Sequence, residues 1–277
     1  MFTINEIKEM EVKEISELEA LEVIFDNHYS KIMPRLSKHF LGGYVNNELV
    51  AVMTLGWGVQ PLNTIKNLFP SLTSKDYYEI GKMCLLEEMP KNSESIFISK
   101  VLNFVKNNYK HIKLIFTWAD GILGKPGYVY QASNFLYGGY ISTDLYISEN
   151  GEKVHPRTAQ GVMNERDGFG IGRRPDKDFL IKHRWNHYRG KQFRYVYFLC
   201  NKREKKKLLN ETEYNWNQPF PKDKDISWRK KNLDEGKWYD TDNISYIKDA
   251  YVKYNKTVLK NRDKINKVKN ARKFFDF

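Results

Sequence analysis

Asp120 and Tyr130 are the residues of this sequence that best combine a reactive side chain with a suitable position. Asp120 follows an apolar run, Ile112–Trp118, and directly precedes Gly121, and Tyr130 comes ten residues later. A carboxylate and a phenol can accept and donate protons, and binding sites are often built at the ends of sheet strands. The structural alternatives are an Asp-Gly turn for the first residue and a core aromatic for the second.

Four predicted elements position these two side chains. The apolar run predicts a strand, and Gly124 and Gly127 keep the following loop flexible or let it take positive φ. Residues 128–134 predict a short helix with Asn134 as its C-terminal stop, and residues 135–140 return to strand composition. This order places the carboxylate and the phenol near one mouth of a sheet.

The same stretch carries a resemblance to known proteins. Tyr130 followed by Gln-Ala-Ser-Asn-Phe resembles the helix of GNAT acyltransferases, in which a tyrosine shortly precedes a Gly-Phe or Asn-Phe pair. The fuller string from Trp118 to Asn134 resembles the Mom family of phage DNA-modification proteins, a GNAT-like group. Further matches follow in the order that this family requires, over approximately residues 20–222: His28-Tyr29-Ser30 with Met33-Pro34, Gly43-Tyr44 with Glu48-Leu49-Val50, and residues 79–86, 90–95, 194–199 and 219–222.

The resemblance implies an α/β fold of the GNAT type. Such a fold has a mixed, mostly antiparallel central sheet flanked by helices. We expect a catalytic domain over residues 1–222, with a polar insertion at 155–190 that serves as a lid, and a basic helical extension over 223–277. The glycines at 168, 170 and 172 resemble a phosphate loop, but no strand precedes them and no Gly-Lys-Ser follows, so a P-loop is rejected.

The resemblance also implies a reaction. Mom-like proteins place a carbamoylmethyl group on the 6-amino nitrogen of adenine in DNA, which masks restriction sites. In that reaction Asp120 would orient or deprotonate the amine, Tyr130 would protonate the leaving group, and Ser95 with nearby backbone N–H groups would bind the donor's carbonyl oxygen. The residues expected to bind substrate are His28, Tyr29, Ser30, Trp57, Asn92, Ser133 and Asn134. For Trp57 a core position under a loop is the favoured alternative.

The turn Met89–Ser95 departs from the acyl-CoA pattern. Enzymes that use acyl-CoA hold its pyrophosphate on a glycine-rich turn at a helix N-terminus, whereas this turn has no glycine and contains Pro90 and Glu94. Acetyl-CoA is therefore disfavoured as the cofactor. We expect instead an activated glycine as donor, with glycyl-tRNA as a candidate carrier, and the sequence defines no metal site.

The charge distribution favours a nucleic-acid partner. The formal net charge is +12, with ten basic residues against one acidic residue in 182–207 and sixteen against nine in 222–277. Residues 6–22 are acidic, with seven glutamates and two lysines. A lysine-rich composition that merely keeps the protein soluble is the alternative. The residues expected to contact double-stranded DNA are Arg173, Arg174, Lys182, Arg184, Lys191, Arg194, Lys256, Lys260, Lys264 and Lys267.

Other features indicate a cytoplasmic protein, in the host cytoplasm if phage-encoded. No apolar run reaches the roughly 18 residues of a membrane helix, and residues 1–14 lack a secretion signal. Cys84 and Cys200 have no metal-ligand spacing and are expected as buried thiols.

Local patterns predict the remaining elements. These are strands at 8–15, 77–86 and 194–200, helices at 17–27, 94–107 and 244–273, a hairpin at 40–57 turning at Asn46-Asn47, and an irregular loop at 61–74.

Two other function classes stay open. A non-catalytic DNA-binding protein on a GNAT scaffold would use the basic surface without Asp120 and Tyr130. An ordinary N-acetyltransferase would bind acetyl-CoA and be indifferent to DNA.

Overall fold

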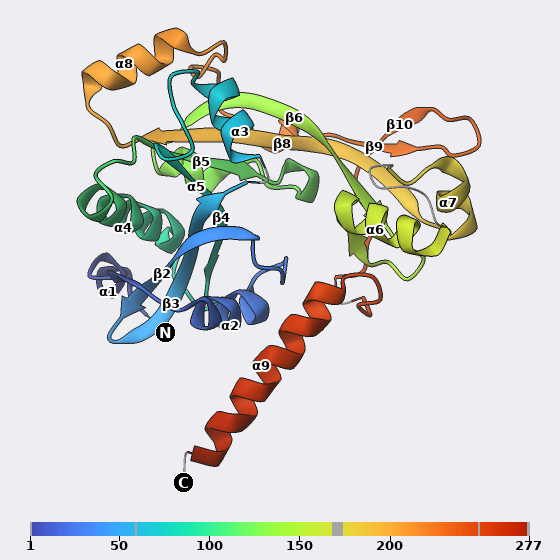
Figure 1. Ribbon diagram of the computed structural model, residues 1–277, viewed down its shortest axis with the longest axis horizontal. Helices are drawn as coiled ribbons and strands as arrows, with labels where there is room; N and C mark the ends of the chain where they lie inside the picture. Colours follow the sequence, from blue (N-terminus) through green and yellow to red (C-terminus); the bar gives the residue numbers. More distant parts are fainter. Residues whose placement is uncertain (1, 59, 168–173, 249, 276–277) are drawn as a thin grey trace.

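A single ten-stranded sheet runs through the protein (Figure 1). The computed structural model describes residues 2–58, 60–167, 174–248 and 250–275. The strand order is β1-β2-β3-β4-β5-β8-β6-β7, with β9 also pairing with β8 and β10 with β9. The strands are β1 (Glu11–Glu14), β2 (Leu36–Val45), β3 (Glu48–Trp57), β4 (Tyr77–Leu85), β5 (Leu114–Ala119), β6 (Leu136–Ile147), β7 (Lys153–Val154), β8 (Asn186–Phe198), β9 (Trp228–Lys231) and β10 (Trp238–Thr241).

Helices cover both faces of this sheet. Ile7 and Phe97 from two of them pack in the largest hydrophobic cluster, whereas Ala20 and Ile24 of another pack against Val52 on the other face. The helices are α1 (Ile4–Lys8), α2 (Glu17–Asn27), α3 (Pro61–Leu68), α4 (Ser93–Asn108), α5 (Tyr128–Ala132), α6 (Pro156–Asp167), α7 (Lys177–Lys182), α8 (Lys202–Glu211) and α9 (Lys256–Phe275), with short 3₁₀ turns η1 (Gly121–Leu123) and η2 (Asp223–Asp225). The expected mixed, mostly antiparallel sheet flanked by helices is confirmed.

Several local predictions are confirmed because short-range chemistry decides them. Ser16 caps α2 through a reciprocal capping box with Glu19. Asn46 and Asn47 have positive φ, as a tight two-residue hairpin turn requires. Asn134 also has positive φ and ends the short helix α5.

Two segments near the N-terminal half differ from expectation. The predicted strand at 8–15 begins later, at Glu11, because Thr3 and Glu6 form a capping box that starts helix α1. The predicted irregular loop at 61–74 contains α3, which lacks a side-chain cap hydrogen bond from Gln60 but begins with Pro61, a residue that favours the first helical position.

The insertion is a packed unit rather than a polar loop. Helices α6 and α7 bury Met163 and Phe179 against Trp185, and the long strands β6 and β8 carry this unit away from the body (Figure 1). The strand predicted from Arg194 begins at Asn186, inside the segment assigned to the insertion. The Gly-Phe-Gly-Ile-Gly motif and Arg173 lie outside the described residues.

The C-terminal extension adds to the same sheet before it becomes helical. Strands β9 and β10 form a hairpin on β8. The predicted helix at 244–273 begins only at Lys256, so Ile247 and Tyr251 lie in the segment that precedes α9, here called the strap (described residues 242–248 and 250–255). Helix α9 then runs back to α2, where Lys269 and Arg272 pair with Asp26 and Glu22 at 2.8 and 3.1 Å.

Candidate active site

The site lies where the two parallel strands of the sheet separate. Strands β4 and β5 pair only from Tyr77 with Leu114 to Glu79 with Phe116. A register shift opposite Thr54 and Leu55 places Gly81 at a bulge in β4 just beyond the last pair. On β5, Thr117 Oγ1 lies 3.4 Å from the carbonyl oxygen of Ile80 and 3.3 Å from the hydroxyl of Tyr130. The Tyr130 hydroxyl therefore sits in the opening between the strands.

Close packing fixes the position of Asp120 at the end of β5. A Cβ on Gly121 would come within 2.4 Å of the Phe193 ring, and one on Gly127 within 2.7 Å of the Tyr195 ring. Gly127 also has φ +92°, which a residue with a side chain rarely adopts. Gly121 and Gly127 thus let the chain pack closely between β5 and α5, and the positive φ expected for Gly124 and Gly127 is confirmed.

Asp120 accepts hydrogen bonds from two distant elements. The hydroxyl of Tyr29 donates to Asp120 Oδ2, and Gln192 Nε2 on β8 donates to Oδ1 at 3.3 Å. A carboxylate has about four lone-pair sites, so Asp120 can still accept hydrogen bonds from a ligand.

Tyr29 lies among cationic side chains. Its ring stacks on that of His28 at a centroid distance of 4.1 Å. The ammonium groups of Lys125, Lys82 and Lys153 lie 4.1, 5.8 and 5.8 Å from the Tyr29 ring centroid. These lysines come from the loop after η1, from β4 and from β7, so three elements converge on one ring.

Burial and charge set the protonation states in this cluster. Burial, reinforced by the charge of Lys82, lowers the pKa of His28 to about 3, so its imidazole is neutral at pH 7. Burial lowers the pKa of Lys82 to about 8 despite the opposing charge of Asp120. Although 41% of Tyr29 is exposed, its hydroxyl contacts Asp120, and burial of that end plus the negative charge raises its pKa above the usual value.

Tyr130, which was expected to protonate the leaving group, is buried. Only 9% of it is exposed, and burial raises its pKa to about 12. Its hydroxyl is therefore protonated at pH 7, and Asp120 contributes to the raised pKa from nearby. The structure brings Asp120 together with Tyr29 rather than pairing it directly with Tyr130.

Ser95 and Asn92 line a groove of about 560 Å³ next to this cluster. The groove lies between the start of α4 and the Gly124–Tyr128 loop, and Lys125 belongs to both the groove and the Tyr29 cluster. Asn92, at the N-cap position of α4, has positive φ and makes no side-chain cap hydrogen bond. Ser95 Oγ donates to the Asn92 carbonyl oxygen at 2.9 Å.

Charged residues of both signs line this groove: Glu94 and Asp223 are acidic, and Lys91 and Lys125 are basic. The Ser93 backbone N–H donates to the Pro90 carbonyl oxygen at 3.2 Å and so is not free for an anion. That coenzyme A is disfavoured stays a prediction. Across the described residues, no three His, Cys, Asp or Glu side chains gather in a way that could hold a metal ion.

Three of the expected substrate-binding residues make structural contacts within the protein. The Trp57 indole N–H donates to the Ser74 carbonyl oxygen at 2.8 Å and its ring packs on Tyr78, as the core alternative predicted. Ser133 is buried and donates to the Val129 carbonyl oxygen. Ser30 binds the His28 ring through its backbone N–H at 2.9 Å, which orients the imidazole.

Arg194 is not available to DNA. It is 6% exposed, donates to the Gly138 carbonyl oxygen at 2.7 Å and stacks 4.1 Å from the Tyr214 ring centroid. Lys191 donates to the Asp225 carbonyl oxygen at 2.7 Å. These two basic residues of β8 hold the sheet and the C-terminal segment together.

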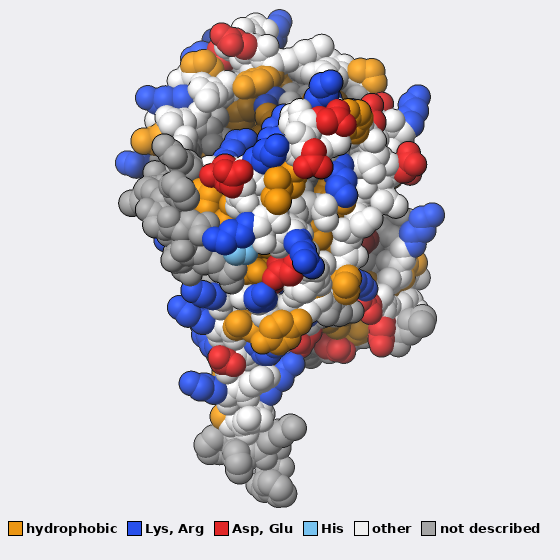
Figure 2. Space-filling view, turned by 90° about the vertical axis from the view of Figure 1, so that its right-hand side faces the viewer, with side chains coloured by type: hydrophobic (Ala, Val, Ile, Leu, Met, Phe, Trp, Pro, Cys, Tyr) orange, Lys and Arg blue, Asp and Glu red, His pale blue; other side chains and the backbone are white. Residues whose placement is uncertain are grey.

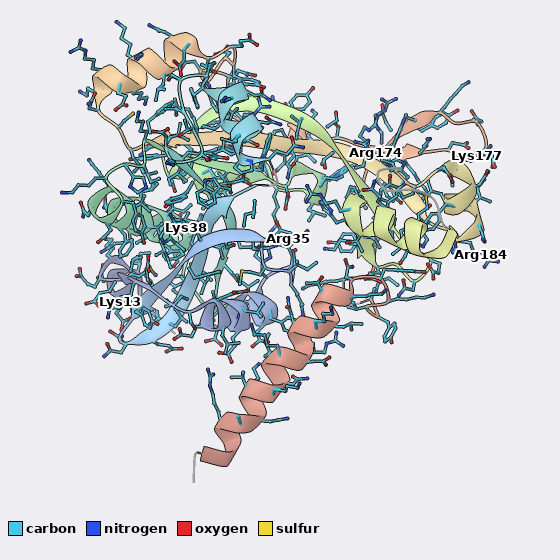
Figure 3. The ribbon with its side chains drawn as sticks, viewed as in Figure 1. Lys13, Arg35, Lys38, Arg174, Lys177 and Arg184 are labelled. Carbon is cyan, nitrogen blue, oxygen red and sulfur yellow. The ribbon has the colours of Figure 1, made fainter. Side chains whose placement is uncertain are left out.

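Arg174 and Arg184 lie at the far end of the insertion (Figure 3). Arg174 forms an ion pair with the buried Asp144, with 2.7 Å between Nη1 and Oδ2, yet 72% of the Arg174 side chain is exposed. Lys182 and Arg184 line a hollow of about 470 Å³ with Lys253. On the face seen in Figure 2, basic side chains lie over the whole height of the molecule with acidic ones between them. Lys256, Lys260, Lys264 and Lys267 are exposed on α9.

Sequence reasoning missed four polar residues near the site. Lys82, Lys125 and Lys153 come from separate elements, and only Lys82 gives a signal, as a lysine within an apolar strand. Glu79 on the same strand also stands out, because burial raises its pKa to about 7 while it accepts a hydrogen bond from the Gly58 backbone.

Known proteins similar to this chain in sequence belong to the family whose motifs it carries. A model of the Mom protein family matches residues 9–222. The chain is 33% identical over 216 residues to the protein named methylcarbamoylase mom of Escherichia phage Mu, a match that covers 78% of this chain and 85% of that protein. No helix in the described parts of the chain is long and apolar enough to cross a membrane.

Solved acetyltransferases are similar at a lower level. An N-acetyltransferase from Staphylococcus aureus Mu50 has a TM-score of 0.36 and 13% identity, over 69% of this chain and 99% of that one. A probable acetyltransferase from Staphylococcus epidermidis has the same TM-score and coverage at 11% identity. Scores this low carry no weight for function. On the sequence matches, the chain belongs to the Mom protein family.

Proposed function

We propose that this protein is a DNA-modifying transferase that adds a carbamoylmethyl group to the 6-amino nitrogen of adenine. One observation carries the proposal: in a Mom-family chain, the carboxylate of Asp120 stands at the end of β5, bonded to Tyr29 and Gln192 and open to a further ligand. The name methylcarbamoylase, given to the similar phage Mu protein, supports the kind of group transferred. Modified sites would be masked from restriction enzymes.

The acceptor amine needs both positioning and proton removal. Its lone pair is delocalised into the purine ring, so it is a poor nucleophile. The remaining lone pairs of Asp120 would accept an amine N–H, orient the nitrogen and receive its proton. Enzymes that act on a base in a duplex take it out of the stack, and Tyr29, exposed at the rim of the site, would meet the extruded base.

The product's connectivity restricts the donor. The adenine nitrogen ends on a methylene carbon, so direct acetyl transfer cannot form the product. In the proposed first step that nitrogen attacks the carbonyl carbon of an activated glycine ester, the carbon–oxygen bond to the carrier breaks, and the carrier oxygen takes a proton. Tyr130, whose pKa of about 12 keeps it protonated, would supply that proton.

A second step completes the product without redox chemistry. The glycyl amine attacks ring carbon C6 through a five-membered intermediate and displaces the original amine nitrogen. That nitrogen becomes the terminal amide, so atoms and electrons balance. The carrier of the glycine, for which glycyl-tRNA is a candidate, stays a prediction.

Double-stranded DNA is the proposed macromolecular substrate. The net charge of +12 and the exposed cations of the insertion and α9 would attract its phosphates. These contacts would place the duplex without reading its sequence.

Mass spectrometry of nucleosides from cells expressing the protein tests the proposal. We expect an adenosine heavier by one carbamoylmethyl group, and its loss in Asp120→Asn and Tyr130→Phe variants. Unmodified adenosine after verified soluble expression would contradict the proposal. A non-catalytic DNA-binding protein would bind DNA equally well in both variants, and an ordinary N-acetyltransferase would bind acetyl-CoA and ignore DNA.

A further inference from the structure

Three lysines surround the Tyr29 ring, and the nearby carboxylate of Asp120 acts on all three. Lys82, Lys125 and Lys153 each have their ammonium group within 5.8 Å of the ring centroid. In the described part of the chain, no Asp or Glu oxygen lies within 4.0 Å of any of these three groups. Asp120, which accepts hydrogen bonds from the neutral Tyr29 and Gln192 side chains, supplies one negative charge against these three positive charges. The cluster therefore carries an excess of positive charge at the entrance of the site.

Holding this charge is costly for the fold. Burial lowers the pKa of Lys82 to about 8, and the charges of Lys125 and Lys153 act in the same direction. Burial also lowers the pKa values of Lys125 and Lys153 from their ordinary value. A charged group removed from water is unfavourable unless something pairs with it, so a ligand that brings negative charge would offset the cost.

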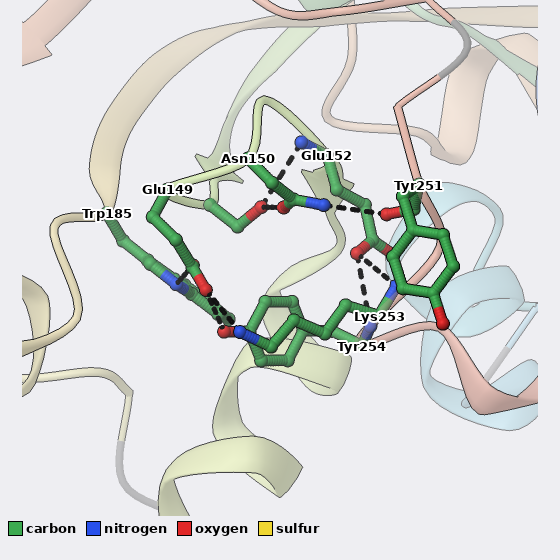
Figure 4. A network of polar contacts seen from close by, with 8 residues as sticks. Glu149, Asn150, Glu152, Trp185, Tyr251, Lys253 and Tyr254 are labelled. Atoms are coloured by element: carbon green, nitrogen blue, oxygen red, sulfur yellow. Dashed lines mark hydrogen bonds and ion pairs between the residues drawn. The ribbon is translucent and has the colours of Figure 1, made fainter.

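The C-terminal extension fixes one of the three lysines. Lys153 follows the β6–β7 turn, on which Glu152 accepts hydrogen bonds from the backbone N–H groups of Lys253 and Tyr254, at 2.9 and 3.1 Å (Figure 4). On the same turn Glu149 bonds Lys253 Nζ and the Tyr254 hydroxyl, both at 2.7 Å.

The same strap brings an aromatic ring to the site. The backbone N–H of Ile247 donates to the Gly151 carbonyl oxygen at 3.0 Å, next to Tyr246. The Tyr246 ring centroid lies 4.4 Å from Lys153 Nζ, and 41% of Tyr246 is exposed. Lys153 is thus held between the rings of Tyr29 and Tyr246 by a segment beyond the part of the chain that matches the Mom family.

We propose that Lys82, Lys125 and Lys153 form a binding site for one phosphate group of a nucleotide substrate beside the Tyr29–Asp120 pair, an inference that rests on the proposed function. A phosphate group suits this arrangement because its oxygens point in several directions, toward cations supplied by three different elements. Lysine binds phosphate as a point charge and needs no planar geometry. With its phosphate on the lysines, the base or ester of the same nucleotide would face Asp120.

Two substrates could supply this phosphate. One is the DNA strand, through the phosphodiester next to the target adenine. The other is the nucleotide chain that carries the glycine, through the phosphodiester next to its terminal adenosine. Deoxyadenosine 5′-monophosphate and the ribotrinucleotide CCA represent the two sources as probes.

The experiment compares matched variants of the full chain by calorimetric titration. The test variant carries Lys82→Gln, Lys125→Gln and Lys153→Gln. The control variant carries Lys66→Gln, Lys106→Gln and Lys110→Gln, three exposed lysines on α3, α4 and the loop after α4, and so loses the same net charge. Each protein is titrated with the two probes and with deoxyadenosine and adenosine, which lack the phosphate.

We expect the wild-type and control proteins to bind at least one phosphate-bearing probe roughly tenfold more tightly than its nucleoside. In the test variant this ratio should fall toward one. If the affinity ratio falls only for the deoxynucleotide, the site binds the DNA strand. If it falls only for CCA, the site binds the nucleotide chain that carries the glycine. An unchanged ratio in the test variant, or no phosphate dependence in the wild-type protein, overturns the site.

Two further measurements keep the outcome interpretable. If the triple variant fails to fold, Lys125→Gln alone, at an exposed position, gives the same comparison with a smaller loss. Phosphate-dependent binding without any modified adenosine in cells would support this site and contradict the proposed reaction, so the two failures are distinguishable.

Discussion

The hydroxyl of Tyr29 donates a hydrogen bond to the carboxylate of Asp120 across 91 residues of sequence. Tyr29 lies two residues after the end of α2, and Asp120 directly follows β5, so the bond joins two motifs that are separate in the chain. Asn261 on α9 also contacts the Lys31 carbonyl oxygen at 3.1 Å and so supports the segment that carries Tyr29. The bond therefore depends on the N-terminal segment, the sheet and the C-terminal helix together.

Replacing Tyr29 by Phe should reduce the modification of adenosine by roughly ten- to a hundredfold, because Asp120 loses one of its two hydrogen-bond donors. The fold should be retained, since Tyr29 is partly exposed. Quantitative nucleoside mass spectrometry at matched expression measures the effect. Tyr239→Phe is the matched control, because it removes a tyrosine–carboxylate hydrogen bond, to Glu235, on the β10 hairpin. Equal yields from the two variants would exclude a role for the Tyr29 hydroxyl.

Replacing Lys82 by Met should stabilise the protein while impairing its function. The folded-state pKa of about 8 lies below the ordinary lysine value of 10.5, so folding disfavours the charged form. Such a shift corresponds to about 3 kcal/mol, and residual solvent contact should reduce the observed gain in unfolding free energy to about 1–2 kcal/mol.

The pH dependence of this gain follows from the sign of the shift. Below pH 8 Lys82 is charged in both states, and the gain from Met is complete. Between pH 8 and 10.5 the folded wild-type protein loses the proton first, so the gain declines and then disappears. Urea unfolding at pH 7 and pH 10 measures it. A variant less stable than wild type at pH 7 would show that Lys82 is not under electrostatic cost.

Local chemistry made part of this site predictable. Asp120 could be found because its strand, its Asp-Gly boundary and the two glycines after it are contiguous in sequence. The bond to Tyr29 could not, because it depends on how α2 docks on the sheet. Lys125 and Lys153 lie in polar segments where a lysine is unremarkable, and only folding brings them to one ring. Arg194 was expected to contact DNA as part of the basic segment 182–207, yet its position facing Trp118 and Tyr214 buries it.

The tail helix can be tested by separating its charge from its packing. Replacing Lys256, Lys260, Lys264 and Lys267 by Gln should weaken DNA binding and flatten its salt dependence if they contact phosphates. These side chains are exposed, so stability should change little. Fluorescence anisotropy with duplex DNA at several salt concentrations measures the slope, and an unchanged slope would make α9 purely structural.

Truncation at about residue 240 should do more than remove charge. It deletes Tyr254, which packs on Trp185 in the core of the insertion, and the buried Val258 and Ile265 of α9. We therefore expect a lower melting temperature for the truncated protein than for the charge variant. A truncated protein as stable as the full chain would contradict this packing role.

Isotope labelling tests the donor and the order of bond formation together. If an activated glycine is the donor, glycine labelled in both carbons and in nitrogen should place all three atoms in the modified base. The rearrangement predicts the position of each nitrogen: the glycine nitrogen becomes attached to ring carbon C6, whereas the original adenine nitrogen becomes the terminal amide. Fragmentation that releases the terminal amide should therefore leave the glycine nitrogen on the purine. Absence of label, or glycine nitrogen in the released amide, would exclude this route. Because Asp120 and Tyr130 serve the first transfer in the proposal, their variants should also accumulate no glycyl-adenosine intermediate.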